Sequence, residues 1–463
     1  MAAADPLQAE LQTAFLMALP RGAGELDPDL SETFIATVLV DAAARRPSPE
    51  AAAFLRILAA LGPPDTRRAV SGALGALTED GFYPMDWVTE AGKPLPGQAW
   101  RRYDVFGDSE IIAVTFGYGD AEHAIAVQVD LCRLPIAIQV AVVPDAPELL
   151  DVIQRDDEPL GRVEPISLAE ARRRIEAPLA RCDQGRHPDL SVSSLTFLPV
   201  ARARVRRLPT ADAPPADRTF DAAGRAAAVD DFMASPHAAQ AGADEKTMRF
   251  WAEVLTGYSG SVPGEAPSRV GPRKLSEMLL SYVPNTFALS SVQRFTMEAA
   301  VTAWTRWAAA RQDLDDAATQ YLADHLPKVL AGFGEAYEDP ANVIVRGYLA
   351  DLSATSTDAS WLFGALTRRH FAVPFPEDRS GGRRARDLDA ADPAQRRAII
   401  EAEFGDCTPP GGMTSAQFLD GALRVTDQIW EDDPPQTWQA ARRMLDAGTP
   451  RHDIIHDLVM HAR

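Results

Sequence analysis

The chain has 463 residues, of which 46% are hydrophobic, and its 46 lysine and arginine residues against 66 acidic residues give a net charge of −20. This length and composition are typical of a globular protein of roughly two to four domains and exclude a wholly disordered chain. The negative charge repels phosphate backbones and anionic lipids, so neither nucleic acid nor a membrane surface is an expected partner.

Residues 1–80 are predicted to form a helical region. Four segments with helical spacing of apolar residues, beginning at Pro6 and ending near Leu77, are separated by proline and glycine. Asp5 and Glu10 precede most of the apolar residues of the first segment. The start of the chain is therefore predicted to be an amphipathic helix and not a signal peptide.

Residues 81–208 are predicted to contain a small antiparallel β-meander with helices. Apolar residues alternate with smaller or polar ones in three runs, which are residues 109–116, 121–130 and 136–143. In the helix expected to follow, Ser167 and Glu170 have the spacing of a capping box. The pattern of residues 192–208 fits a helix and a strand equally well.

Residues 218–374 are predicted to form a central helical domain, which follows the proline- and alanine-rich stretch 208–217. Its longest helices are expected at residues 290–312 and 314–337. Proline lacks the helical hydrogen-bond donor, so the second of these helices is expected to be interrupted or kinked at Pro327.

Residues 375–395 are interpreted as a polar linker, and residues 396–463 as a C-terminal module that ends in three helices. The first helix, residues 415–430, is expected to bury one apolar face, made of Phe418, Ala422, Val425 and Ile429. Capping and breaking residues mark the other helix ends: Asp433 before the second helix, Gly448 after it, and Thr449 and Pro450 at the start of the third.

The cysteines indicate the compartment. Cys132, Cys182 and Cys407 lie far apart and form no Cys-x-x-Cys pair, which is typical of a protein in a reducing cytosol. The most apolar run, residues 134–143, is about half of the ~20 residues that a membrane-spanning helix needs. A cytoplasmic location without membrane insertion is therefore expected.

The last helix contains the sharpest candidate for chemistry, His452-Asp453-x-x-His456. It differs by one acidic residue from the His-Glu-x-x-His signature of zinc proteases. Histidines four residues apart lie only about 40° apart around a helix, which allows both to bind one metal ion. Asp453 stands where the protease motif has its general base.

A third ligand for zinc or iron would have to come from another segment. His461 lies about 180° around the helix from His452, so a distant carboxylate such as Asp427 or Glu431 is the candidate. The alternative interpretation needs no cofactor: the two histidines are structural and hydrogen-bond to a neighbouring helix.

His123 and Asp130 flank the second predicted strand and are a further binding candidate, because function often lies on the loops at strand ends. Side chains alternate along a strand, so these two are expected to point to opposite faces. The sequence contains no Walker motif, and the Gly-x-Ser segment at Gly257 lacks the second glycine of a nucleophile elbow.

The segment QIWEDDPPQTWQAARRMLDAGTPRHDIIHDL, residues 428–458, is the most distinctive of the chain. It is similar to a helical module, Asp-Asp-Pro-Pro-x-x-Trp…Arg-Leu…Gly-x-x-Arg-His-Glu-x-x-His, found at the C-termini of bacterial proteins. The chain as a whole resembles a family of large, uncharacterised, intracellular proteins of high-GC bacteria. No activity comes with this resemblance.

Members of that family tend to carry a second histidine pair, His-x-x-x-His-Glu, in the helix before the Asp-Asp-Pro-Pro turn. The corresponding positions here are Phe418, Ala422 and Leu423, which are all apolar, and Asp453 replaces the glutamate of the final motif. The resemblance therefore implies either a metal site that has lost most of its ligands or a structural histidine pair beside a repacked core.

These patterns together predict a mainly α-helical α+β protein. The favoured function is that of a non-enzymatic cytosolic binding or regulatory protein with an unknown protein partner. The alternative is a metal-binding protein or a metal-dependent hydrolase that uses the final helix.

Overall fold

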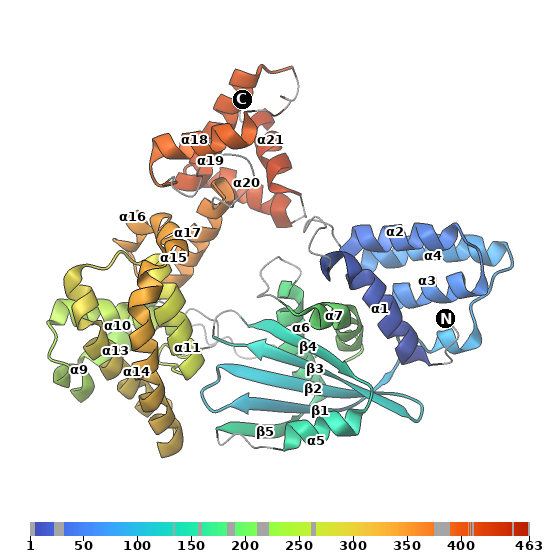
Figure 1. The fold of residues 1–463 in the computed structure, drawn as a ribbon, viewed down its shortest axis with the longest axis horizontal. Helices are drawn as coiled ribbons and strands as arrows, with labels where there is room; N and C mark the ends of the chain where they lie inside the picture. The colour runs from blue at the N-terminus through green and yellow to red at the C-terminus, as the bar shows by residue number, and fades with distance from the viewer. Residues whose placement is uncertain are drawn as a thin grey trace. The chain divides into compact units, whose positions relative to one another are not determined.

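The computed structural model describes residues 5–22, 32–132, 135–155, 160–182, 190–210, 222–260, 265–374, 389–405, 407, 409, 412–446 and 449–461. The chain divides into two compact units, Met1–Asp217 and Arg218–Arg463 (Figure 1). Most of the described residues are helical, and the described strands form one antiparallel sheet, which confirms the mainly α-helical α+β class.

Unit 1 begins with the predicted helices, which the structure describes as α1 (Pro6–Gly22), α2 (Glu32–Ala44), α3 (Pro49–Leu61) and α4 (Pro64–Glu79). At the start of α3 the Ser48 hydroxyl accepts a hydrogen bond from the Ala51 N–H at 3.1 Å, and Pro49 fits the first turn. The short helix η1 (Asp86–Thr89) leads to the sheet. Buried side chains of these helices and of the sheet belong to one hydrophobic core.

The sheet has the strand order β4-β3-β2-β1-β5. Its described strands are β1 (Leu95–Asp104), β2 (Ser109–Tyr118), β3 (Ala121–Asp130), β4 (Ile136–Val143) and β5 (Gly161–Ile166). The predicted meander is β2, β3 and β4, paired antiparallel. The sequence did not indicate β1 and β5, because neither alternates apolar and polar residues and β5 contains Pro165.

The helix α5 (Ala146–Gln154) lies between β4 and β5 in the chain, and α6 (Leu168–Arg181) and α7 (Val192–Val205) follow β5. Residues 192–208, whose sequence pattern fitted a helix and a strand equally well, thus contain the helix α7. In Figure 1 α6 and α7 lie against the sheet; α6 contacts β1 to β4, and α7 contacts β4 and α1. The Ser194 hydroxyl of α7 accepts a hydrogen bond from the Val140 N–H of β4 at 3.1 Å. Ser167 caps α6 by accepting from the Glu170 N–H.

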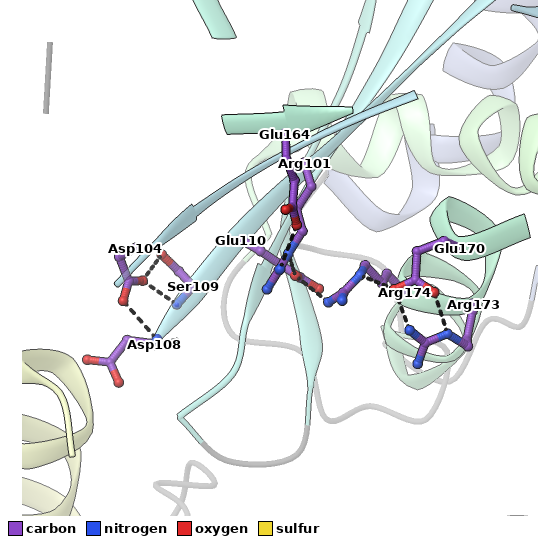
Figure 2. Close-up of polar contacts among 9 residues, drawn as sticks. All are labelled: Arg101, Asp104, Asp108, Ser109, Glu110, Glu164, Glu170, Arg173 and Arg174. Atoms are coloured by element: carbon purple, nitrogen blue, oxygen red, sulfur yellow. Dashed lines mark hydrogen bonds and ion pairs between the residues drawn. The ribbon is translucent and has the colours of Figure 1, made fainter. Parts of the chain in front are cut away.

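A buried carboxylate fixes α6 on the sheet. Glu110 of β2 is 3% exposed, and its Oε2 accepts hydrogen bonds from Arg101 Nε at 2.7 Å and from Arg174 Nη1 of α6 at 2.8 Å (Figure 2). Glu164 binds the same Arg101, and Glu170 binds the same Arg174. A carboxylate without such partners is costly to bury, so the ion pairs favour this one position of α6.

Unit 2 is helical throughout its described residues. Its first part contains α8 (Ala222–Met233), α9 (Pro236–Gln240), α10 (Glu245–Ser259), α11 (Pro272–Glu277), η3 (Met278–Tyr282), α12 (Val283–Thr286), α13 (Ser291–Arg311), α14 (Asp316–Glu338), α15 (Pro340–Gly347), α16 (Ala350–Ser353) and α17 (Ala359–Ala372). The predicted interruption at Pro327 is wrong, because α14 runs through it. Pro327 lies on the exposed side of α14, while Leu326 and Val329 are buried and hold the helix in place.

The C-terminal module contains α18 (Pro393–Phe404), α19 (Ser415–Glu431), α20 (Pro435–Asp446) and α21 (Arg451–His461). Each residue of the predicted apolar face of α19 is at most 1% exposed. Tyr348 and Phe371, which precede the module in sequence, are buried in the same core. The polar segment 375–395 lies largely outside the described residues, and α18 begins within it.

Two predicted helix starts are shifted by one residue. The peptide bond between Asp433 and Pro434 is cis, and α20 begins at Pro435. The last helix, α21, begins at Arg451, where the Ile454 N–H donates to the Pro450 carbonyl. Gly448 lies outside the described residues. No helix in the described ranges is long and apolar enough to cross a membrane.

Candidate metal centre

Three potential metal ligands converge in the C-terminal module. They are Cys407, which follows α18, and His452 and His456 of α21, and one donor atom of each lies within 4.8 Å of the others. Cys407 Sγ is 3.7 Å from His452 Nε2. The ring centroids of the two histidines are 4.6 Å apart. The four-residue spacing of the histidines therefore places both rings at one point on the surface of α21.

The carboxylates suggested as third ligands lie elsewhere. Arg396 donates to Asp427 Oδ1 from Nε at 2.9 Å and to Glu431 Oε1 from Nη2 at 3.5 Å. Cys407, which precedes His452 by 45 residues, is the third potential donor instead. The sequence does not indicate Cys407 as a ligand, because it lies far from the histidines in the chain and belongs to no Cys-x-x-Cys pair; the fold brings its thiol to them.

Two aromatic rings surround the histidines. The Phe404 ring stacks on His452, with centroids 5.1 Å apart and planes 13° apart. The centroid of Phe418 lies 4.5 Å from that of His456. Burial, and to a smaller extent the neighbouring His452, lower the pKa of His456, so its imidazole is neutral at pH 7. A neutral imidazole is the form that binds a metal ion.

The Nε2 atom of His456 is buried and has no hydrogen-bond partner among the residues that the structure describes. A buried polar atom in this condition costs about 1–3 kcal/mol. Coordination of a metal ion through Nε2 would remove that cost. This atom therefore points to a ligand more strongly than the spacing of the histidines does.

Arg451 anchors the start of α21 immediately before His452. It donates to the carbonyl oxygens of Phe371 and Ala372, the latter at 2.7 Å, and it forms an ion pair with Glu403 of α18. The last carbonyls of a helix lack intrahelical donors and favour a cation, so Arg451 satisfies the C-terminus of α17. The histidines are thus held on a helix that is tied to two others.

The distance between Cys407 Sγ and His452 Nε2 fits a tetrahedral ion of the zinc class. Bonds of about 2.3 Å to sulfur and about 2.0 Å to nitrogen, at a tetrahedral angle, place the two donor atoms about 3.5 Å apart. The observed separation of Cys407 Sγ and His452 Nε2 is 3.7 Å. A thiolate and two imidazoles suit zinc or a similar transition metal and do not suit magnesium or calcium.

Two cavities of unit 2 are lined by residues far from this cluster in the sequence. Two adjoining cavities of about 550 and 800 Å³ lie along α9, α13 and α14 and share four residues of their walls, which are His237, Glu298, Thr302 and Arg306. Size alone would favour the larger one as a binding site. We centre the assignment on the ligand cluster, because it combines converging donors with a buried atom that lacks a partner.

The second candidate pair does not form a site. His123 is 1% exposed, and its Nε2 accepts a hydrogen bond from Arg204 Nε at 2.9 Å. Arg204 also pairs with Glu10, whose Oε1 accepts from the Tyr118 hydroxyl at 2.6 Å. Asp130, at the other end of β3, accepts from the Cys132 N–H. His123 is therefore part of a buried polar network in the core of unit 1.

This network makes the stability of unit 1 dependent on pH. Burial, with a smaller contribution from Arg204, lowers the pKa of His123 to about 3. The unfolded chain takes up this proton near pH 6.5, so the unfolded state binds more protons between about pH 6.5 and 3. We expect His123 to remove about 1.4 kcal/mol of stability for each pH unit below about 6.

Urea unfolding between pH 7 and 4.5, followed in the wild-type chain and in His123→Gln, measures this effect. Other groups titrate in both proteins, so the difference between their slopes isolates His123. Equal slopes would show that the histidine does not control this pH dependence.

Comparison with known protein families, curated proteins and solved structures found no match for this chain, so the assignment of the cluster rests on its own geometry.

Proposed function

We propose that the chain is a non-enzymatic metal-binding protein of the cytosol with a regulatory role. Its C-terminal module holds one zinc ion, or a similar transition metal, through Cys407, His452 and His456. The observation that supports this proposal most is the convergence of the three donors around a buried His456 nitrogen that lacks a hydrogen-bond partner. A thiolate ligand that must stay reduced supports the cytosolic location.

Such an ion would join two parts of the module. Cys407 follows α18, whereas both histidines belong to α21. Binding to the folded state alone stabilises a protein by about 2.7 kcal/mol when the free metal is at 100 times its dissociation constant. Metal binding would therefore determine how stably α21 packs in the C-terminal module. A protein partner that contacts this surface would then respond to the presence of the metal.

Metal analysis of the untagged chain tests the proposal. After loading with zinc and desalting, we expect one zinc ion per chain, and we expect His456→Ala and Cys407→Ser to lower the zinc affinity at least about 100-fold. Loss of an outer-shell partner alone costs about 10–100-fold, so loss of a direct ligand should cost no less. Addition of a chelator should also lower the melting temperature of the wild-type chain.

His461→Ala is the matched control, because His461 lies on the same helix, is exposed and does not belong to the cluster. It should bind zinc as the wild type does. Far-UV circular dichroism identifies variants that fail to fold. Zinc well below one ion per chain in the wild type, or equal zinc in all the folded variants, would contradict the proposal and leave the histidines as structural residues.

A second candidate is a metal-dependent hydrolase. It is favoured by one observation: Asp453 is exposed and directly follows the ligand His452, at the position of the general base in the zinc-protease motif. In that case Asp453→Asn should lower the rate of ester or peptide hydrolysis about 10²–10⁴-fold and leave the zinc content unchanged. The absence of zinc-dependent hydrolysis across a panel of esters and peptides would leave the non-enzymatic function.

A further inference from the structure

We infer that an ion held by Cys407, His452 and His456 keeps one coordination position open to solvent, and that this position binds small anions such as carboxylates. The inference rests on the proposed function and defines the ligand class of the same site. Zinc that serves only structure is closed by four protein ligands, whereas an open position admits an exogenous ligand.

The helix that faces the histidines supplies no fourth donor. Phe418 of α19 occupies the space next to His456, and Ala422, one turn further along α19, is fully buried. The Thr426 hydroxyl donates within its own helix, to the carbonyls of Ala422 and Leu423 at 2.9 and 3.0 Å. The buried face of α19 thus presents carbon atoms to the site.

The carboxylates of α18 and α19, the two helices that pack beside the cluster, have cationic partners. Glu403 of α18 forms an ion pair with Arg451, and Glu401 accepts from Arg397 Nε at 2.7 Å. Arg396 forms ion pairs with Asp427 and Glu431 of α19, the two carboxylates that the sequence offered as third ligands. Cys407 and the two histidines are the ligand group found among the described residues. A fourth ligand from any of these carboxylates would require an ion pair to break.

One side of the cluster faces solvent. Phe404 stacks on His452 and Phe418 covers His456, so aromatic carbon closes the buried side. His452 itself is exposed, and Cys407 and His456 are partly exposed. The open position of a tetrahedral ion would therefore be directed away from the phenylalanines and toward water.

The net charge of the metal site determines which class of exogenous ligand it favours. A doubly charged ion with one thiolate and two neutral imidazoles has a net charge of +1. The aromatic rings on the buried side of the ion lower the local dielectric response there and strengthen its attraction for a negative group. One monoanion in the fourth position neutralises the site, so carboxylates and similar small anions are favoured over neutral molecules.

Cobalt(II) provides the test, because it binds the same ligands as zinc and its visible absorption depends on its ligands. We expect the cobalt-loaded chain to show a thiolate-to-metal band and tetrahedral d–d bands. Titration with azide, and separately with acetate, should shift the d–d bands to a saturable end point. The thiolate band should persist throughout, because the protein ligands stay in place. Equal additions of sodium chloride account for ionic strength.

Phe418→His is the matched variant, because it puts an imidazole beside His456 and offers a fourth protein ligand. We expect it to bind cobalt at least as tightly as the wild type and to lose the response to azide and acetate. No thiolate band in wild-type protein would refute the proposed function itself. A thiolate band with d–d bands that ignore both anions would overturn only the open position.

Discussion

Arg204→Leu is expected to destabilise unit 1 by about 3–5 kcal/mol, because it leaves a buried carboxylate without its cation. The side chains of Arg204 and Glu10 are both fully buried and form an ion pair between α7 and α1. Without Arg204, the Glu10 carboxylate would keep the Tyr118 hydroxyl and the Gly92 N–H as donors, both at 2.6 Å. Two neutral donors do not replace a guanidinium, and His123 would lose its donor as well.

Urea unfolding at pH 7 measures this loss. Arg207→Leu is the control, because Arg207 lies nearby in the chain and is exposed; it should change the free energy of unfolding by less than about 0.5 kcal/mol. The double variant Glu10→Gln, Arg204→Met removes both charges and should recover part of the stability. A loss below about 1 kcal/mol for Arg204→Leu would show that the pair does not stabilise the unit.

Arg451→Met is expected to weaken zinc binding about 10–100-fold although it removes no ligand. Arg451 holds the start of α21 on the carbonyls of Phe371 and Ala372 and on Glu403. Methionine keeps much of the apolar contact and loses every one of these hydrogen bonds. Because His452 is the next residue, its ring is then positioned less accurately relative to Cys407.

Zinc affinity measured by competition with a chromophoric chelator checks this prediction, and Arg443→Met is the control. Arg443 is exposed on α20 and is not part of the cluster, so its removal should leave the affinity unchanged. If Arg451→Met folds and binds zinc as tightly as the wild type, the site does not depend on this anchor.

The helices and the central strands were predictable because the residue patterns that specify them lie within each element. In β2 and β3 the alternation of apolar residues follows the pleat, and in α19 the apolar face follows the helical period. β1 and β5 have no such pattern. They are strands because β1 pairs with both β2 and β5, and because Arg101 and Glu164 join the ion pairs under α6. Contacts between distant segments produce no pattern within a few consecutive residues, so the local sequence does not predict β1 and β5.

The candidate site likewise has one part that the local sequence predicts and one part that only the tertiary fold forms. The pairing of His452 with His456 follows from helix geometry, which is local, and the sequence is sufficient to place it. Cys407 reaches the pair through tertiary packing, in which α18 contacts α19 and also α21, through Glu403 and Phe404. Acidic residues such as Asp427 were closer in sequence, but Arg396 binds Asp427. The resemblance to the bacterial family stays a prediction, as does the unknown protein partner.

The hydrogen bond between Ser194 and Val140 has a consequence for the solution behaviour of the chain. β4 lies at one edge of the sheet, and the Val140 N–H that an incoming strand would need is already donated to a helix. At the other edge β5 is short, and its Pro165 has no N–H to offer. Open strand edges recruit further strands and start aggregates. Both features disfavour the extension of this sheet by a strand from a second chain.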